Sequence, residues 1–349
     1  MSDTFPTAPA PVVTRLNPGD VPAEVVDRLR SGAIVAPADV AVLDLTGPGA
    51  VASFQGLLTN DIEKPGDGAF VYGALLTPKG MIVVDGWAAW LGARVRFTVP
   101  AEGRERAATI FQRSVPPRLA RTVDRTAEFA VLRVAGAHAV AILGASGLPV
   151  PPHASHAVEA TLGDLPFEIA RASDRASFVF QITVAAEHQT AIIERLVRAG
   201  GAGVADAAAL ELARILAGWP RLGSEVDEKT IPQEVGYDEI GGVSYTKGCY
   251  TGQETVSRLH FRGHANRQLR GLLFETDSPA PPAEGWSAVT EDERDVGRVT
   301  SIAWVAGADR WIGLAVIRRE VAIGAVVRAA GREARVVTLP FDIPAVGPA

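Results

Sequence analysis

The segment that decides the fold runs from residue 247 to 254 and reads Lys-Gly-Cys-Tyr-Thr-Gly-Gln-Glu. It closes a longer stretch, 231–254, that is rich in glycine, tyrosine and polar side chains and has weak helical or strand periodicity. That pattern is typical of a shaped loop. The four glycines between 241 and 252 permit close backbone approach, so that neighbouring amides can point at a ligand. We therefore predict the functional centre in this loop.

The only cysteine of the chain, Cys249, lies in the middle of the segment. A single cysteine cannot form an internal disulfide, a multi-cysteine zinc site or a self-contained iron-sulfur centre. The thiolate is the nucleophilic form, and a neighbouring cation such as Lys247 favours it. The residues alone leave two interpretations open: Cys249 is a reactive thiol assisted by Lys247, or it is a small buried hydrophobic residue.

Length, composition and charge limit the classes of protein to which this chain can belong. The chain has 349 residues, 47% hydrophobic and 21% charged, which predicts two or three ordinary globular domains. A net charge of -6 gives no positive field for nucleic acid or a membrane surface. No signal-like N-terminus or apolar membrane span is evident, so we expect a cytoplasmic protein, most simply a monomer. The close pair His260 and His264 is interrupted by Gly263, and we expect no metal site.

Periodicity predicts an α+β protein in several units. We expect a flexible tail at 1–20, a discontinuous α+β unit formed by 21–125 and 205–262, a second α+β unit at 126–204, and a small antiparallel β-barrel-like unit at 263–349. Strand-like runs between 70 and 99, broken at Pro78-Lys79-Gly80 and Gly92-Ala93, predict a meander. Expected helices are 22–29, 48–58, 101–114, 187–198 and 206–217, the last capped by Asp206 and ended by Gly218.

The segment 247–254 resembles the signature of the YgfZ family of folate-binding proteins, relatives of the aminomethyltransferase (T-protein) of the glycine cleavage system. Other stretches resemble the same family in the same order: Phe54-Gln-Gly-Leu-Leu-Thr-Asn-Asp61, Leu76-Thr-Pro-Lys-Gly80 followed by Asp85, Arg214-Ile215 with Ala217-Gly218, Glu228-Lys-Thr-Ile-Pro-Gln-Glu234, and Gly297-Arg-Val-Thr-Ser301. The resemblance spans about 50–305.

This resemblance implies a three-part architecture around a central folate-binding opening, with a barrel-like C-terminal domain. It also implies a tetrahydrofolate-dependent factor that supports iron-sulfur cluster assembly or repair in client proteins. Lys247 and Cys249 are the hallmark residues, and Asp85 lies near the carboxylate that aminomethyltransferases use at the folate, so the resemblance predicts Cys249, Lys247 and Asp85 as catalytic residues. One position departs from the pattern, because Leu216 stands where many relatives have an acid that binds the pterin. Glu211, five residues earlier, is about 140° away on a helix, so we expect it to be a poor geometric substitute for that acid.

Several further residues are candidates for binding the cofactor, a tetrahydrofolate in one-carbon-substituted or polyglutamylated form. Asp85 follows an apolar run, where a carboxylate is costly unless it is paired, although capping of the strand end is an alternative. The other candidates are Asn60, Glu234, Tyr250 and Gln253, for each of which a turn, loop-orienting or packing role competes with ligand contact.

A basic cluster completes the list of candidates. Between 247 and 270 there are five basic residues and one acid, a local net charge of +4. Such a run is most often a solvated face, but Arg258 and Arg262 are also suited to the carboxylates of a glutamate tail. Three functions remain open: the folate-dependent accessory factor, a true one-carbon transferase, and a non-catalytic folate-binding module.

Overall fold

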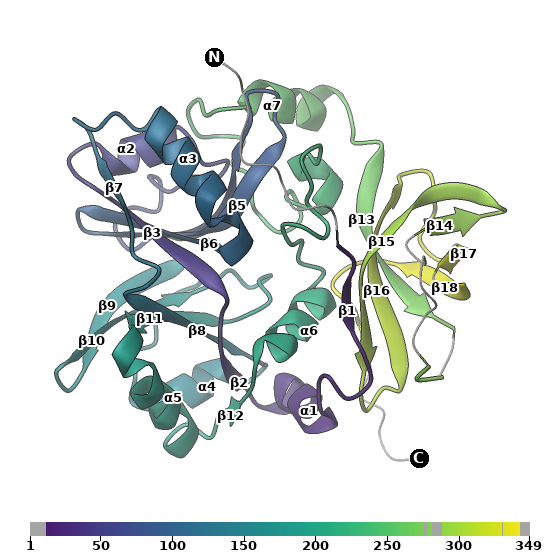
Figure 1. Ribbon diagram of the computed structural model, residues 1–349, viewed down its shortest axis with the longest axis horizontal. Helices are drawn as coiled ribbons and strands as arrows, with labels where there is room; N and C mark the ends of the chain where they lie inside the picture. The colour runs from purple at the N-terminus through teal and green to yellow at the C-terminus, as the bar shows by residue number, and fades with distance from the viewer. Residues whose placement is uncertain (1–11, 276–277, 281–287, 330, 343–349) are drawn as a thin grey trace.

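The computed structural model describes residues 12–275, 278–280, 288–329 and 331–342. Three sheets of five, six and seven strands organise these residues. Figure 1 shows the five- and six-stranded sheets stacked on one side of the molecule and the seven-stranded sheet beside them. The predicted α+β class with a C-terminal barrel is confirmed. No helix among the described residues is long and apolar enough to cross a membrane.

The five-stranded sheet contains the predicted meander. Its strand order is β4 (Phe70–Leu76), β5 (Ile82–Leu91), β6 (Arg94–Pro100), β3 (Val40–Thr46) and β7 (Arg121–Asp124). The meander turns lie where the sequence places the Pro78–Gly80 and Gly92 breaks, so this prediction is confirmed. Helices α2 (Ala50–Gln55) and α3 (Arg104–Ser114), the latter after a 3-10 turn at Ala101–Gly103, cover one face. Phe54 of α2 packs edge-on against Phe97, with the ring centroids 5.2 Å apart.

The six-stranded sheet has the order β12 (Gly203–Val204), β2 (Ile34–Pro37), β8 (Phe129–Ala135), β11 (Phe180–Ala185), β10 (Leu165–Arg171) and β9 (His156–Leu162). Helices α4 (Ala139–Ala145) and α5 (Gln189–Arg198), the latter after a 3-10 turn at Ala186–His188, bury a separate apolar cluster against it. We expected residues 21–125 to stay together in the other unit. Instead β2 pairs with β8 and β12, so the chain crosses between the sheets after Pro37.

The two sheets face each other through polar contacts as well as apolar ones. Gln181 of β11 donates a hydrogen bond to the hydroxyl of Thr98 on β6 (3.1 Å). Arg96 pairs with Asp44 in its own sheet (2.8 Å) and with Glu168 of β10 across the interface (3.0 Å). Arg96 and Asp44 are both only 2% exposed, and the ion pair of this buried Arg96 with Glu168 helps to fix how the two sheets are aligned.

The C-terminal unit is a closed six-stranded antiparallel barrel. It is formed by β13 (Arg267–Phe274), β14 (Ala288–Glu291), β15 (Arg294–Val305), β16 (Arg310–Arg318), β17 (Val326–Ala329) and β18 (Arg332–Val337), and the β15–β16 pairing closes it. The short strand β1 (Thr14–Leu16) adds in parallel to β15. Of the tail predicted at 1–20, residues 1–11 lie outside the described residues, and 14–16 are an ordered strand because β15 offers them backbone partners.

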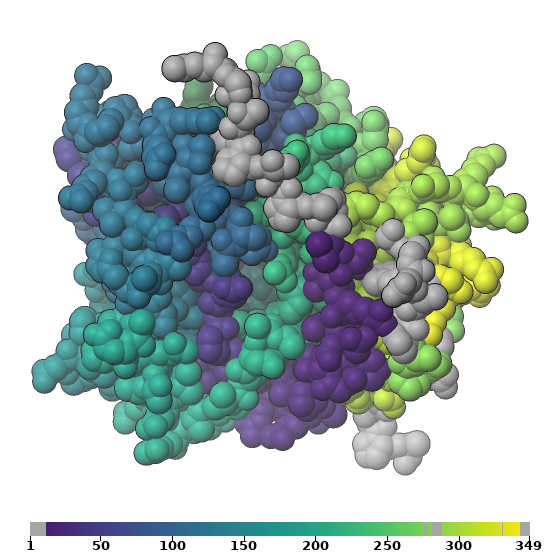
Figure 2. Space-filling model, viewed as in Figure 1, coloured from purple at the N-terminus to yellow at the C-terminus, as the bar shows by residue number. Residues whose placement is uncertain are grey.

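Three helices connect these units. The barrel is joined to the rest by α1 (Ala23–Ser31) and α6 (Ala207–Ala217), and Figure 2 shows the purple N-terminal segment lying along this boundary. The predicted ends of α6 are confirmed, because the Asp206 side chain accepts from the amide of Ala209 and Gly218 adopts a left-handed conformation. A 3-10 turn at Pro232–Val235 interrupts the long loop, and α7 (Gln253–Arg262) follows it. The sequence pattern did not predict α7.

Candidate functional site

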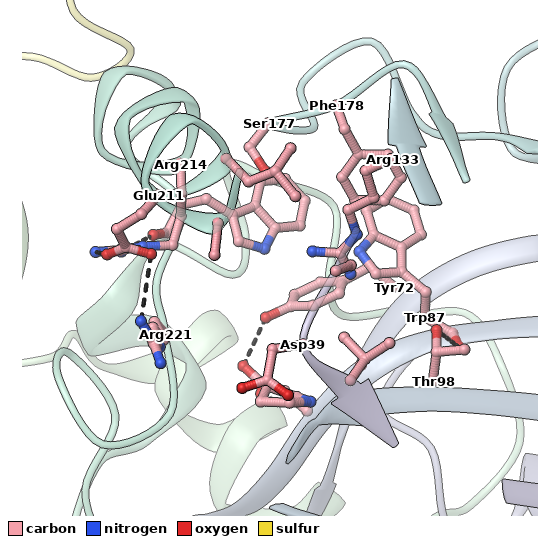
Figure 3. Close-up of a pocket in the computed structure, with 18 of the residues that line it drawn as sticks. Asp39, Tyr72, Trp87, Thr98, Arg133, Ser177, Phe178, Glu211, Arg214 and Arg221 are labelled. Atoms are coloured by element: carbon pink, nitrogen blue, oxygen red, sulfur yellow. Dashed lines mark hydrogen bonds and ion pairs between the residues drawn. The ribbon is translucent and has the colours of Figure 1, made fainter. Parts of the chain in front are cut away.

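A central cavity of about 200 Å³ lies where the two stacked sheets meet α6. Strands β4, β5, β6 and β8, the first turns of α6 and the segment after it all contribute to the wall (Figure 3). Side chains from sequence positions as distant as 39 and 221 therefore converge here. Of the predicted site residues, Asp85 alone lines this cavity.

Asp85 lies on β5 and is 2% exposed. Tyr72 and Tyr237 both donate hydrogen bonds to the same carboxylate oxygen, Oδ2, at 2.6 and 2.8 Å. Burial raises the pKa of Asp85 above its ordinary value, against the opposing effect of the two hydroxyls, which stabilise the charged form. Oδ1 has no side-chain partner among the described residues, so it can accept a hydrogen bond from a ligand.

Aromatic rings form much of the cavity wall. Trp87 and Trp219 are nearly parallel, with the ring centroids 5.7 Å apart. Tyr72 meets Trp219 edge-on at 4.7 Å, and Phe178 meets Trp87 edge-on at 5.2 Å. Flat aromatic faces around a buried carboxyl suit a heteroaromatic ring that carries N–H donors.

Paired charges form a second wall. Glu211 of α6 pairs with Arg214 (2.7 Å) and with Arg221 (3.4 Å). Arg214 also pairs with the fully buried Glu225 (2.9 Å), and Arg221 pairs with Glu102 (3.3 Å). Burial opposes ionisation of Glu211, but the two arginines hold the pKa of its carboxyl below the ordinary value. Every charged group named in this wall therefore has an opposite charge beside it.

The segment 247–254 packs elsewhere, against the α2–β4 loop. Lys247 is 8% exposed, and its ammonium donates to the backbone carbonyls of Gln55 (2.6 Å), Leu58 (2.7 Å) and Asn60 (2.8 Å). Burial lowers the pKa of Lys247 to about 8, against the nearby negative charges of Asp61 and Glu63. Since the three protons of an ammonium match three carbonyls, Lys247 ties its loop to the end of α2.

Cys249 and Tyr250 point to different environments. Cys249 is free and exposed, which argues against the alternative of a buried hydrophobic cysteine. Tyr250 is buried under Lys247, whose Nζ lies 5.1 Å from the ring centroid. Burial raises the pKa of the Tyr250 hydroxyl, and this hydroxyl has no hydrogen-bond partner among the described residues. The ring packs within the loop and does not line the cavity.

The remaining predicted residues also lie outside the cavity wall. Asn60 donates to the carbonyls of Tyr72 (2.7 Å) and Gly241 (2.8 Å), so it joins β4 to the long loop. Glu234 accepts weakly from the amide of Ile231 (3.4 Å), and burial raises the pKa of its carboxyl. Gln253 begins α7, and Arg258 and Arg262 are exposed on that helix.

Sequence reasoning missed most of the cavity wall. Trp87 lies two residues after Asp85 and therefore on the same face of β5, which was a usable signal. Arg133 and Trp219 carry no such signal, because their convergence depends on how the two sheets and α6 pack. Leu216 does not line the cavity, whereas Glu211 does. We expected the 140° between them to make Glu211 a poor substitute for an acid at position 216, but it is Glu211 that lies on the side of α6 that faces the cavity.

Comparisons with known proteins agree with this architecture. The model of the GCVT N-terminal domain matches residues 23–241, and that of the glycine cleavage T-protein C-terminal barrel domain matches 267–342. The tRNA-modifying protein YgfZ of Pectobacterium carotovorum is 24% identical over 87% of this chain and 90% of that protein. The aminomethyltransferase of Rubrobacter xylanophilus is 28% identical over 84% of this chain and 79% of its own length. The crystal structure of the Bartonella henselae glycine cleavage aminomethyltransferase T has a similar fold, with a TM-score of 0.77 at 19% identity, and covers 92% of this chain and 89% of that one.

Proposed function

Because this chain belongs to the YgfZ family within the aminomethyltransferase-like superfamily, we propose that its central cavity binds a reduced folate. The observation that carries the proposal is the buried Asp85 carboxyl, held by Tyr72 and Tyr237 beside the stacked Trp87 and Trp219. Its free Oδ1 suits a ring N–H, and the parallel indoles suit a flat pterin. A cavity of about 200 Å³ is smaller than the ~300–1,000 Å³ of a complete small-molecule site, so the pterin end of the ligand enters and the distal part of the tail extends outward.

Different residues of the cavity wall contact different parts of this cofactor. Asp85 anchors ring nitrogens, the aromatic wall excludes water from the ring faces, and the Glu211–Arg214–Arg221 cluster presents a polar edge. When bound, a reduced folate supplies a carrier for a one-carbon unit. The raised pKa of Asp85 suits a carboxyl that shares a proton with a nitrogen of the ligand.

We further propose that the protein is an accessory factor for iron-sulfur client proteins and that Cys249 is its reactive thiol. The exposure of Cys249 supports this role, because a client protein can reach the thiol without any rearrangement. Lys247 supports Cys249 by anchoring the loop that carries it. A one-carbon transferase remains the second candidate, and it is favoured by the match to the aminomethyltransferase of Rubrobacter xylanophilus.

Replacement of the thiol tests the first of these two candidates. We predict that Cys249→Ser keeps the melting temperature and folate affinity of the unmodified protein, since the side chain is exposed and outside the cavity. The variant should nevertheless fail to restore the activity of iron-sulfur enzymes in cells that lack the protein. Ser257→Cys in the Cys249→Ser background is the matched control for restoring a thiol at the wrong position. Full activity of Cys249→Ser, or a Cys249 thiol protected from alkylation, would remove the thiol from the proposal.

The transferase is tested separately. Purified protein would be given a methylated or aminomethylated folate and candidate acceptors, and product formation would be followed. Multiple turnovers that are unaffected by Cys249→Ser would favour the transferase.

A further inference from the structure

Arg133 reaches the cavity from the opposite sheet to Asp85. On β8, successive side chains point to opposite faces. Leu132 and Val134 are fully buried in the cluster under α4 and α5. Arg133, between them, therefore faces the other way and lines the cavity. Figure 3 shows its guanidinium pointing into the space between the aromatic side chains.

The guanidinium of Arg133 lacks the partners that its neighbours have. Its Nε is buried without an acceptor among the described residues. Its carbon Cζ lies 4.4 Å from the centroid of the Phe178 ring, and no carboxylate in the described part of the chain forms an ion pair with it. The other two arginines of the cavity wall, Arg214 and Arg221, both have ion pairs with glutamates.

An unpaired cation in such a place is costly. Burial lowers the pKa of Arg133 to about 10, so the group stays charged at neutral pH and bears the cost of desolvation. Phe178 recovers part of this cost through its ring face and also fixes the plane of the guanidinium. What remains unsatisfied is a planar fork of N–H donors open to the cavity, and a carboxylate matches that fork in shape and charge.

We propose that Arg133 binds a carboxylate of the ligand and so makes the cavity select pteroylglutamates over neutral pterins. This inference rests on the proposed folate site and deepens it by naming a specificity-determining residue. Arg133 is a better candidate than Arg258 or Arg262 for the first carboxylate of the ligand, because those two arginines lie outside the cavity wall.

The test compares two ligands by calorimetry: tetrahydrofolate, and 6-methyltetrahydropterin, which has the ring but no carboxylate. The variants are Arg133→Met, which keeps the length of the side chain, and Arg133→Lys, which keeps the charge without the fork. Arg121→Met, at an exposed position on β7, is the matched control. Because a charge-assisted hydrogen bond contributes more than a neutral one, Arg133→Met should bind tetrahydrofolate about 10- to 100-fold more weakly. Its affinity for the methylpterin should be unchanged, and Arg133→Lys should be intermediate.

The melting temperature of the free protein separates binding from folding. Removal of an unpaired charge should leave the melting temperature unchanged or raise it. Removal of an arginine that holds the structure together would lower the melting temperature. A strong drop in Arg133→Met, an equal loss for both ligands, or undiminished folate affinity would each overturn the assignment. Absence of folate binding by the unmodified protein would overturn the proposed function, and this inference with it.

Discussion

At the scale of single residues, Asp85 and Lys247 are both buried ionisable groups, but they serve different purposes. Asp85 has one oxygen held by two tyrosines and one available to a ligand. All three acceptors of Lys247 belong to the backbone. The Asp85 arrangement leaves one carboxylate oxygen without a side-chain partner, as is usual at a functional site. The Lys247 arrangement uses all three ammonium protons to hold the structure together.

Asp85 predicts a specific pH dependence of stability. Its pKa in the folded chain is raised above the ordinary 3.8, so its contribution to stability is present at low pH and is lost as the pH rises through the folded value. Asn cannot ionise. At neutral pH the melting temperature of Asp85→Asn should therefore be higher than that of the unmodified protein. This difference in melting temperature should narrow as the pH falls toward about 4.

Thermal melts across pH 4–8 measure this gap, and Asp164→Asn, at an exposed position in the turn between β9 and β10, is the control. Asp85→Asn should at the same time bind tetrahydrofolate about 10- to 100-fold more weakly, because a charge-assisted hydrogen bond is lost. A pH-independent gap would mean that Asp85 is not desolvated in solution.

Lys247 predicts a loss of stability. Lys247→Met leaves three carbonyls at the end of α2 without their donor, at an expected cost of about 2 to 4 kcal/mol. The melting temperature should fall by about 5 to 10 °C. Lys247→Arg should not rescue it, because a planar fork does not fit three converging acceptors. Lys79→Met, at an exposed turn, is the control; equal melting of Lys247→Met and Lys79→Met would contradict this role.

At the scale of elements, α7 carries the basic cluster that the sequence pointed out. Arg258 and Arg262 are exposed on it, so they can meet only a part of the ligand that extends beyond the cavity. We predict that polyglutamylated folate binds roughly two- to thirty-fold more tightly than the monoglutamate, with a preference that shrinks as salt rises.

The double variant Arg258→Ala with Arg262→Ala should abolish this preference and keep the affinity for the monoglutamate. Arg118→Ala with Arg121→Ala, also exposed, should change neither. Equal binding of short and long tails at low salt would make the cluster a solvated face.

The sequence predicted the positions of helices and strands better than it predicted which of them pack together. The capping chemistry of Asp206 and Gly218 placed α6 correctly, and turn residues placed the β4–β6 meander. Helix α7 was missed because its apolar spacing is short and the residue that precedes it is Gly252, with a φ of 83°. An added Cβ there would lie 2.6 Å from the carbonyl oxygen of Thr77, so this glycine reports close packing of the loop on the β4–β5 turn.

At the scale of the whole molecule, the cavity and the cysteine loop are separate parts of one architecture. The family resemblance indicated both Asp85 and Cys249, but only the packed structure shows that Asp85 lines the cavity and that Cys249 is exposed outside it. Arg133, Phe178 and Trp219 reach the cavity from three different segments. No local pattern encodes that convergence, because it arises from the stacking of the two sheets against α6.

The central claim is that reduced folate occupies this cavity, and a cavity-filling variant tests it most directly. Ala207, in the first turn of α6, lines the cavity and is exposed rather than part of the buried core, so Ala207→Trp can fill the space without disturbing the core. Val204→Trp, three residues earlier and 61% exposed, is the control. Calorimetric titration with tetrahydrofolate should give saturable one-to-one binding for the unmodified protein and for Val204→Trp, with at least about tenfold weaker binding for Ala207→Trp. No binding up to millimolar ligand, or equal affinity of the two tryptophan variants, would contradict the account.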